Sequence, residues 1–249
     1  MTWQAIMGLI ATIALCIPVI FIIAFKLWTY RSFAALLIYY IGILTYNLFV
    51  EGYLPASYTL IHYWGIFTNL LEVPLLLIFL SYSCPSQRGF KCIKYLFFGY
   101  IAFEIVVMSI TGLNTNGLTY TIGPGLLIIF ILCFRYFIRY AIITIQHDKA
   151  IGKTFMIGGL LLGFCLYIVL YIIFYIVKTD QTVGVNFMYN AATANSAILM
   201  AIGLFIERKR INKVKELKIT RRELYEMYKD NPPQGGNLPY LDFDREAWN

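Results

Sequence analysis

The chain has 249 residues, of which 60% are hydrophobic and 13% charged, and its mean hydropathy is +0.71. These values exclude an ordinary water-soluble domain, because the apolar residues lie in uninterrupted runs of about twenty, the length of a bilayer-crossing helix. The formal net charge of +7 would suit a nucleic-acid-binding protein, but basic membrane loops account for it, so we expect no nucleic-acid partner.

Seven hydrophobic segments are long enough to cross a bilayer. In chain order they cover residues 5–25, 33–50, 62–83, 93–112, 124–146, 154–177 and 187–206. The first lacks a preceding basic region and is too long for a typical signal peptide, so we expect it to remain as a spanning helix. The sequence therefore predicts an all-α fold, a seven-helix membrane bundle over 1–206, followed by a separate tail over 207–249.

The basic residues of the loops alternate between the two ends of the bundle. Lys and Arg follow the first, third, fifth and seventh segments, whereas the loops after the second, fourth and sixth hold one basic residue, Lys178. Loops rich in Lys and Arg stay on the cytoplasmic side. This pattern predicts a multi-pass protein of the cell (inner) membrane, with its N-terminus outside and its C-terminus in the cytoplasm.

The tail after the seventh segment has two parts. Residues 207–222 hold eight Lys or Arg and two Glu, which predicts a basic helix along the anionic inner leaflet. Residues 223–249 hold six acidic residues and include the irregular stretch Asn231-Pro-Pro-Gln-Gly-Gly236. Two interpretations stay open for this second part: a solvated tail, or a segment that docks on a cytoplasmic protein partner.

Three formal charges fall near the predicted midplane of the bilayer. Glu72 and Glu104 each lie about ten residues into their segments, roughly 15 Å at the rise of an α-helix, and Arg135 lies at a similar depth. A lone charge at that depth is costly, so we expect Arg135 to pair with one of the two acids. Arg139, one turn away, can pair with the second acid or reach the cytoplasmic interface.

Further polar residues gather between the midplane and the outer side. His62, Asn69 and Glu72 share a narrow face of the third segment. Other segments also carry polar faces, although helix packing or an interfacial aromatic belt would explain those faces without a ligand. Their common location favours an outward-facing pocket bounded at the bottom by Glu72 and Arg135. The predicted ligand-binding residues are Glu72, Arg135, Asn69, Asn190, Glu104, Asn47, Glu51, His62, Arg139 and Tyr171.

Several chemistries are disfavoured by missing motifs. The seventh segment has no lysine for a retinal Schiff base, and no familiar hydrolase motif is present. The five cysteines lack metal-ligand spacing supported by histidines and are typical of apolar packing. We therefore expect no metal site and no cofactor, and we favour a protein that is not an enzyme.

The stretch Asn69-Leu-Leu-Glu-Val-Pro-Leu75 resembles a segment of uncharacterised bacterial seven-helix inner-membrane proteins. The resemblance covers about one segment and contains no catalytic motif. It implies the same fold and membrane but no particular activity.

These features favour a receptor or sensor that binds a small polar or anionic ligand from outside. In this hypothesis Arg135 neutralises the ligand or Glu72, Asn69 and Asn190 orient the ligand, and Glu72 responds by protonation or pairing. One alternative is a small-solute or proton-coupled transporter that uses Glu72 or Glu104. A third is a lipid-modifying intramembrane enzyme with Glu72 and His62 as acid and base.

Overall fold

Helices account for all the regular structure in the part of the chain that the computed structural model describes, residues 3–84, 86–147, 150–173 and 182–229. The long helices are α1 (Trp3–Ala24), α2 (Arg31–Val50), α3 (Tyr58–Ser81), α4 (Gln87–Thr111), α5 (Thr115–His147), α6 (Ile151–Tyr171) and α7 (Thr182–Lys229). Each contains a stretch long and apolar enough to cross a membrane. The predicted all-α, seven-helix membrane fold is confirmed.

Among the helix starts, that of α5 departs furthest from the prediction, because the helix begins at Thr115 instead of residue 124. Gly112, with a φ of 78°, ends α4, and Asn114 Oδ1 then accepts a hydrogen bond from the Gly117 N–H at 2.8 Å. That bond satisfies a free backbone donor of the first turn. Pro124 consequently lies inside α5, where a membrane helix tolerates it.

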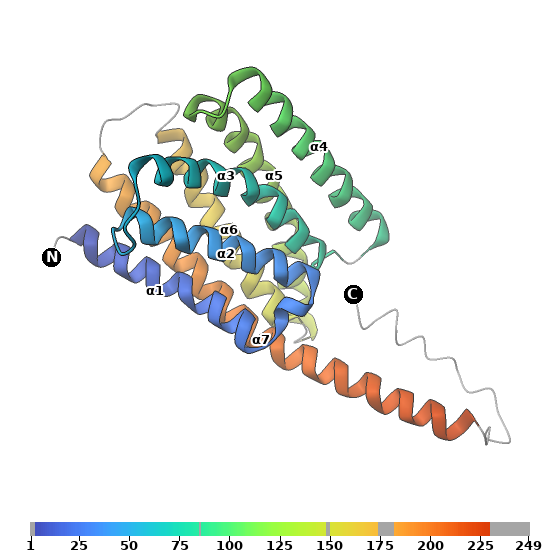
Figure 1. The fold of residues 1–249 in the computed structure, drawn as a ribbon. Coiled ribbons are helices and arrows are strands. Elements are labelled where there is room, and N and C mark those ends of the chain that lie inside the picture. The colour runs from blue at the N-terminus through green and yellow to red at the C-terminus, as the bar shows by residue number, and fades with distance from the viewer. Residues whose placement is uncertain (1–2, 85, 148–149, 174–181, 230–249) are drawn as a thin grey trace.

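The helices run alternately up and down, which gives the bundle two distinct ends (Figure 1). We call the end that holds residue 3 and the α2–α3 and α4–α5 connections the N-terminal end. The opposite end holds the α1–α2 and α3–α4 connections and their Lys and Arg residues, and we call it the basic end. α7 packs against α6 and α1, α3 packs against α2, and α4 lies outermost against α3 and α5.

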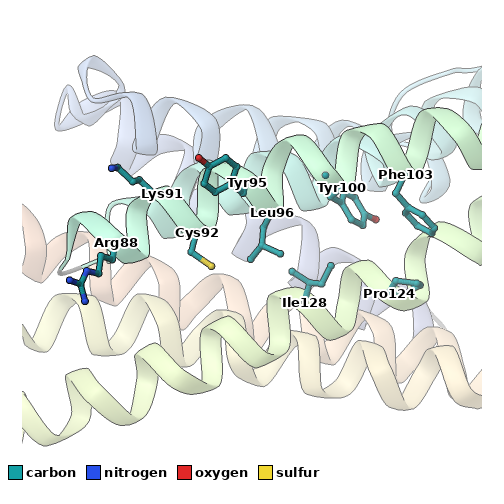
Figure 2. Close-up of a pocket in the computed structure, with 10 residues that line it drawn as sticks. Arg88, Lys91, Cys92, Tyr95, Leu96, Tyr100, Phe103, Pro124 and Ile128 are labelled. Carbon is teal, nitrogen blue, oxygen red and sulfur yellow. The ribbon is translucent and has the colours of Figure 1, made fainter.

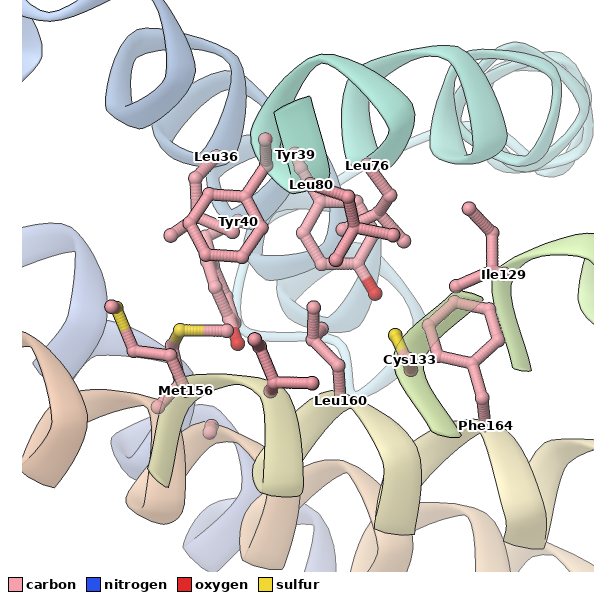
Figure 3. Packing of buried hydrophobic residues seen from close by; sticks show 14 of the residues in the cluster. Leu36, Tyr39, Tyr40, Leu76, Leu80, Ile129, Cys133, Met156, Leu160 and Phe164 are labelled. Carbon is pink, nitrogen blue, oxygen red and sulfur yellow. The ribbon is translucent and has the colours of Figure 1, made fainter. Parts of the chain in front are cut away.

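The half of the bundle towards the basic end is a closely packed hydrophobic core. Figure 3 shows side chains of α2, α3, α5 and α6 meeting there. Several are completely or almost completely shielded from solvent: Leu36, Leu76, Leu80, Met156 and Leu160. This packing separates the basic end from the more polar half described below.

α7 does not end with the bundle but continues as one helix to Lys229. Residues 207–222 are therefore helical, as predicted. Figure 1 shows this extension leaving the bundle roughly along the direction of α1, so it does not turn to follow the membrane surface as we had expected. Of the second part of the tail, residues 223–229 continue α7, and residues 230–249, which include the end of the suggested docking segment, lie outside the described residues.

Candidate functional site: a polar cavity at the N-terminal end

A cavity of about 680 Å³ occupies the half of the bundle towards the N-terminal end. Every long helix except α4 contributes to its lining. Its polar residues are the carboxylates Glu51 and Glu72, the amides Gln4, Asn47, Asn69 and Asn190, the hydroxyl of Thr68, and the tyrosines Tyr46, Tyr167, Tyr171 and Tyr189. A cavity of this size suits a small organic molecule.

Glu72 lies deepest in the cavity, on the middle of α3. The hydroxyl of Tyr39, which is buried on α2, donates a hydrogen bond of 3.2 Å to Glu72 Oε1. One turn earlier on α3, Asn69 donates to the Gly65 carbonyl at 2.7 Å, which leaves its side-chain oxygen available to the cavity. Glu72 is therefore held by a neutral donor, and it remains able to attract a positive group.

The second carboxylate of the cavity, Glu51, ends α2 and lies against the backbone of α1. A Cβ atom at Gly8 would overlap the Glu51 carboxylate, so the glycine makes room for the acid. Beside it, the Asn47 amide donates to Thr12 Oγ1 at 3.3 Å, and that hydroxyl donates to the Gly8 carbonyl at 2.8 Å. These contacts fix the rim between α1 and α2.

Tyrosines from α6 and α7 form the opposite wall. Tyr167 and Tyr189 stack with their ring centroids 5.6 Å apart, and the Tyr167 hydroxyl shares a hydrogen bond of 2.8 Å with Thr193 Oγ1. The Tyr171 hydroxyl donates to the Thr119 carbonyl on α5 at 3.2 Å. The tyrosine spacing on α6, which packing alone would also explain, thus places two aromatic rings against the cavity.

The predicted ion pair between Glu72 and Arg135 is absent, and Arg135 and Arg139 are exposed on the outer surface of α5. The prediction was wrong because α5 begins earlier than expected, which moves Arg135 along the bundle. Val73 and Tyr100 both adjoin Gly125, and Arg135 lies ten residues beyond that level, about 15 Å nearer the basic end. Further along α5, the Tyr140 hydroxyl bonds to the Ser83 carbonyl just after α3.

Glu104 and His62 are also outside the cavity. Glu104 is buried on α4 at nearly the depth of Glu72, and its Oε1 has no hydrogen-bond partner. His62 is exposed and stacks on Tyr58 at the start of α3, with ring centroids 6.5 Å apart. Of the ten predicted ligand-binding residues, the cavity brings together Glu51, Glu72, Asn47, Asn69, Asn190 and Tyr171.

Several residues of the site were not predicted from the sequence: Gln4, Tyr39, Tyr46, Thr68 and Tyr189. Tyr39 was missed because the pattern of the second segment does not indicate that this side chain faces α3. A search for hydroxyl donors at the depth of Glu72 would have found it.

A second polar cluster lies at the basic end, between Tyr82, which directly follows α3, and helix α7. Glu207 of α7 is buried, accepts a hydrogen bond of 2.7 Å from the Tyr82 hydroxyl, and pairs with Arg210 at 2.9 Å. The ammonium group of Lys153, on α6, lies 4.7 Å from the centre of the Tyr82 ring. Helices α3 and α7 therefore both line the cavity, and beyond the hydrophobic core the hydrogen bond between Tyr82 and Glu207 links them a second time.

The fold and the cavity define the class of protein: a multi-pass, seven-helix membrane protein with a polar intramembrane cavity. Comparison with family models, curated proteins and solved structures found no match to this chain.

Proposed function

We propose that this protein is a cell-membrane receptor or sensor that binds a small organic cation in the cavity at its N-terminal end. The observation that carries the proposal is the charge of the lining: it holds Glu51 and Glu72, and no Lys or Arg is among its described residues. The sequence alone led us to expect a polar or anionic ligand, but Arg135, the reason to expect an anion, lies elsewhere.

The aromatic wall supports the same ligand class. Tyr46, Tyr167, Tyr171 and Tyr189 line the cavity together with the two carboxylates. Cations are attracted to aromatic faces, and more strongly where water is excluded. A compact amine or quaternary ammonium compound would neutralise a carboxylate and contact the rings, with Asn69 and Asn190 orienting its polar groups.

The helix connections supply a route for the response. α7 contributes Tyr189 and Asn190 to the cavity and continues without interruption through Glu207 to Lys229. α3 carries Glu72 and is linked to the same helix through Tyr82 and Glu207. A ligand that changes the position of α3 against α7 would therefore move the extension beyond the basic end, where a cytoplasmic partner could read the change.

The alternatives are less well supported. A carrier requires access to its site from both sides of the membrane. The hydrophobic core around Leu76, Leu80 and Leu160 closes the way between Glu72 and the basic end. An enzyme using Glu72 and His62 would need the two side chains together, and they are separate.

The test is ligand binding by the full chain in lipid nanodiscs. We expect choline and putrescine at millimolar concentration to raise the thermal unfolding midpoint, and acetate and glutamate to leave it unchanged. Glu72→Gln hardly changes the shape of the side chain and should abolish this rise of the unfolding midpoint. Glu104→Gln is the matched control, because Glu104 has a similar depth but lies outside the cavity.

The conformational response of α7 is measured separately, by amide hydrogen exchange in residues 187–220. Cation binding to the receptor should change amide protection there, and the Glu72→Gln variant should show no change. If the cations produce no shift, or if the anions produce it instead, the assigned ligand class is wrong. Uptake of choline into proteoliposomes would instead establish the transporter.

A further inference from the structure

A second hollow lies on the lipid-facing side of the bundle, between α4 and α5, and shares no residue with the cavity. It is a groove of about 710 Å³ (Figure 2). Its length is lined by Leu96, Gly99, Tyr100, Phe103, Pro124 and Ile128. An apolar groove on the outside of a membrane helix pair is in contact with lipid acyl chains.

Two basic side chains mark one end of the groove. Arg88 and Lys91 lie on the first turns of α4, three residues apart and therefore neighbours on one face, and both are exposed. Figure 2 places both at the end opposite Phe103 and Pro124, with their charged groups directed to different sides of α4. No Asp or Glu is among the described residues that line the groove, so the basic pair is not neutralised within it.

The dimensions of the groove match one leaflet of a bilayer. From Lys91 to Phe103 the rise of α4 is about 18 Å, and half of a hydrocarbon core is about 15 Å thick. A molecule with its charged group at Arg88 and Lys91 would thus extend an apolar chain to the middle of the membrane. A free phosphate or a soluble anion would use only the basic end.

We propose that the groove between α4 and α5 is a binding site for one anionic glycerophospholipid, with its phosphate between Arg88 and Lys91 and an acyl chain along Leu96, Gly99 and Phe103. The basic end is the one that the loop charges predict to be cytoplasmic, the side on which anionic lipids attract Lys and Arg. The site depends on neither the cavity nor its ligand.

Gly99 provides a direct test of occupancy. A Cβ atom built on Gly99 meets no atom within 4 Å, so Gly99→Leu fills the groove without displacing the protein. Gly184→Leu is the matched control, because Gly184 also has nothing within 4 Å and lies on α7. For the charges, the double variant Arg88→Gln/Lys91→Gln is compared with the double variant Lys26→Gln/Lys94→Gln. The second variant removes the same charge at the same end of the bundle but outside the groove.

The experiment is native mass spectrometry of the delipidated full chain with phosphatidylglycerol, phosphatidylcholine or inorganic phosphate. We expect one phosphatidylglycerol to be retained about tenfold more strongly than phosphatidylcholine, which corresponds to about 1.4 kcal/mol of binding free energy. The Arg88/Lys91 variant should lose this preference, Gly99→Leu should lose retention of both lipids, and both controls should behave as the parent chain.

Three outcomes would overturn the proposal. Equal retention of the two lipids by the parent chain would show that the headgroup is not recognised. A loss in the Lys26/Lys94 control as large as in the Arg88/Lys91 variant would indicate general surface attraction. Competition by inorganic phosphate at the concentration of the lipid would identify a soluble anion as the ligand.

Discussion

Glu72 shows how one residue obtains a tolerable environment inside a membrane bundle. An acid at the centre of a spanning helix costs about 3 kcal/mol on insertion scales. In the structure the cost is offset by the hydrogen bond from Tyr39 and by contact with a polar cavity instead of lipid. The donor is neutral, so the carboxylate can still bind a cation.

We predict that Tyr39 and Glu72 are energetically coupled. Tyr39→Phe should lower the free energy of unfolding by about 2 kcal/mol, because it leaves a desolvated carboxylate without its donor. In a Glu72→Leu background the same change should cost almost nothing. Reversible unfolding in mixed micelles measures the four proteins of this cycle.

Arg135→Gln supplies the control for that cycle. Because Arg135 lies far from Glu72, its effect should be the same in both backgrounds. The prediction is wrong if Tyr39→Phe lowers the free energy of unfolding equally with and without Glu72, while Arg135→Gln is coupled to Glu72. That result would mean that Glu72 pairs with Arg135.

At the scale of elements, the close approach of α6 and α7 positions the tyrosine wall. Ser196 of α7 faces Gly159 and Gly163 of α6: a Cβ at Gly159 would lie 2.9 Å from the Ser196 carbonyl oxygen. Further along, a Cβ at Gly203 would lie 2.7 Å from the backbone nitrogen of Met156. Backbone atoms cannot yield as a flexible side chain can, so both contacts require glycine.

We therefore expect Gly203→Ala to separate the two helices. The added methyl group should lower the free energy of unfolding by about 1–3 kcal/mol, the usual cost of overpacking. Gly184→Ala on the same helix is the control and should not destabilise the protein, because nothing lies within 4 Å of its Cβ and alanine favours a helix over glycine. Thermal unfolding followed by circular dichroism measures both, and a neutral Gly203→Ala variant would contradict the packing described here.

The whole molecule is polarised along its axis. The cavity with Glu51 and Glu72 occupies the N-terminal half, a hydrophobic core follows, and Glu207, Arg210 and the extension of α7 occupy the other end. In the receptor that we propose, this arrangement would separate a ligand-binding half from an output half within one bundle.

The orientation of this axis in the membrane is a prediction from the loop charges. A reporter that is active only in the cytoplasm should work when fused after Asn249 and should fail when inserted at Asn116, because basic loops are retained on the cytoplasmic side. The same reporter inserted after Lys26 should be active and serves as the positive control. Activity at Asn116 alone would reverse the orientation and place the cavity on the inner side.

The sequence by itself determined the number of spanning helices and most of the polar residues of the cavity. Hydrophobic length and helical period are local properties, so seven segments could be counted, and Asn69, Glu72, Tyr171 and Asn190 could be assigned to polar faces. The helix over residues 207–222 was predicted from a different local property, the eight Lys or Arg residues that this stretch contains.

Only the tertiary structure decided which side chains meet. The depth of Arg135 depended on where α5 begins, and that was set by the Asn114 cap instead of by hydrophobicity. The hydrogen-bond partner of Glu72 depended on the rotational orientation of α2 in the bundle, which places Tyr39 beside the acid. Both are consequences of lateral packing between helices that lie far apart in the sequence, and the hydrophobic pattern of a single helix contains no record of its neighbours.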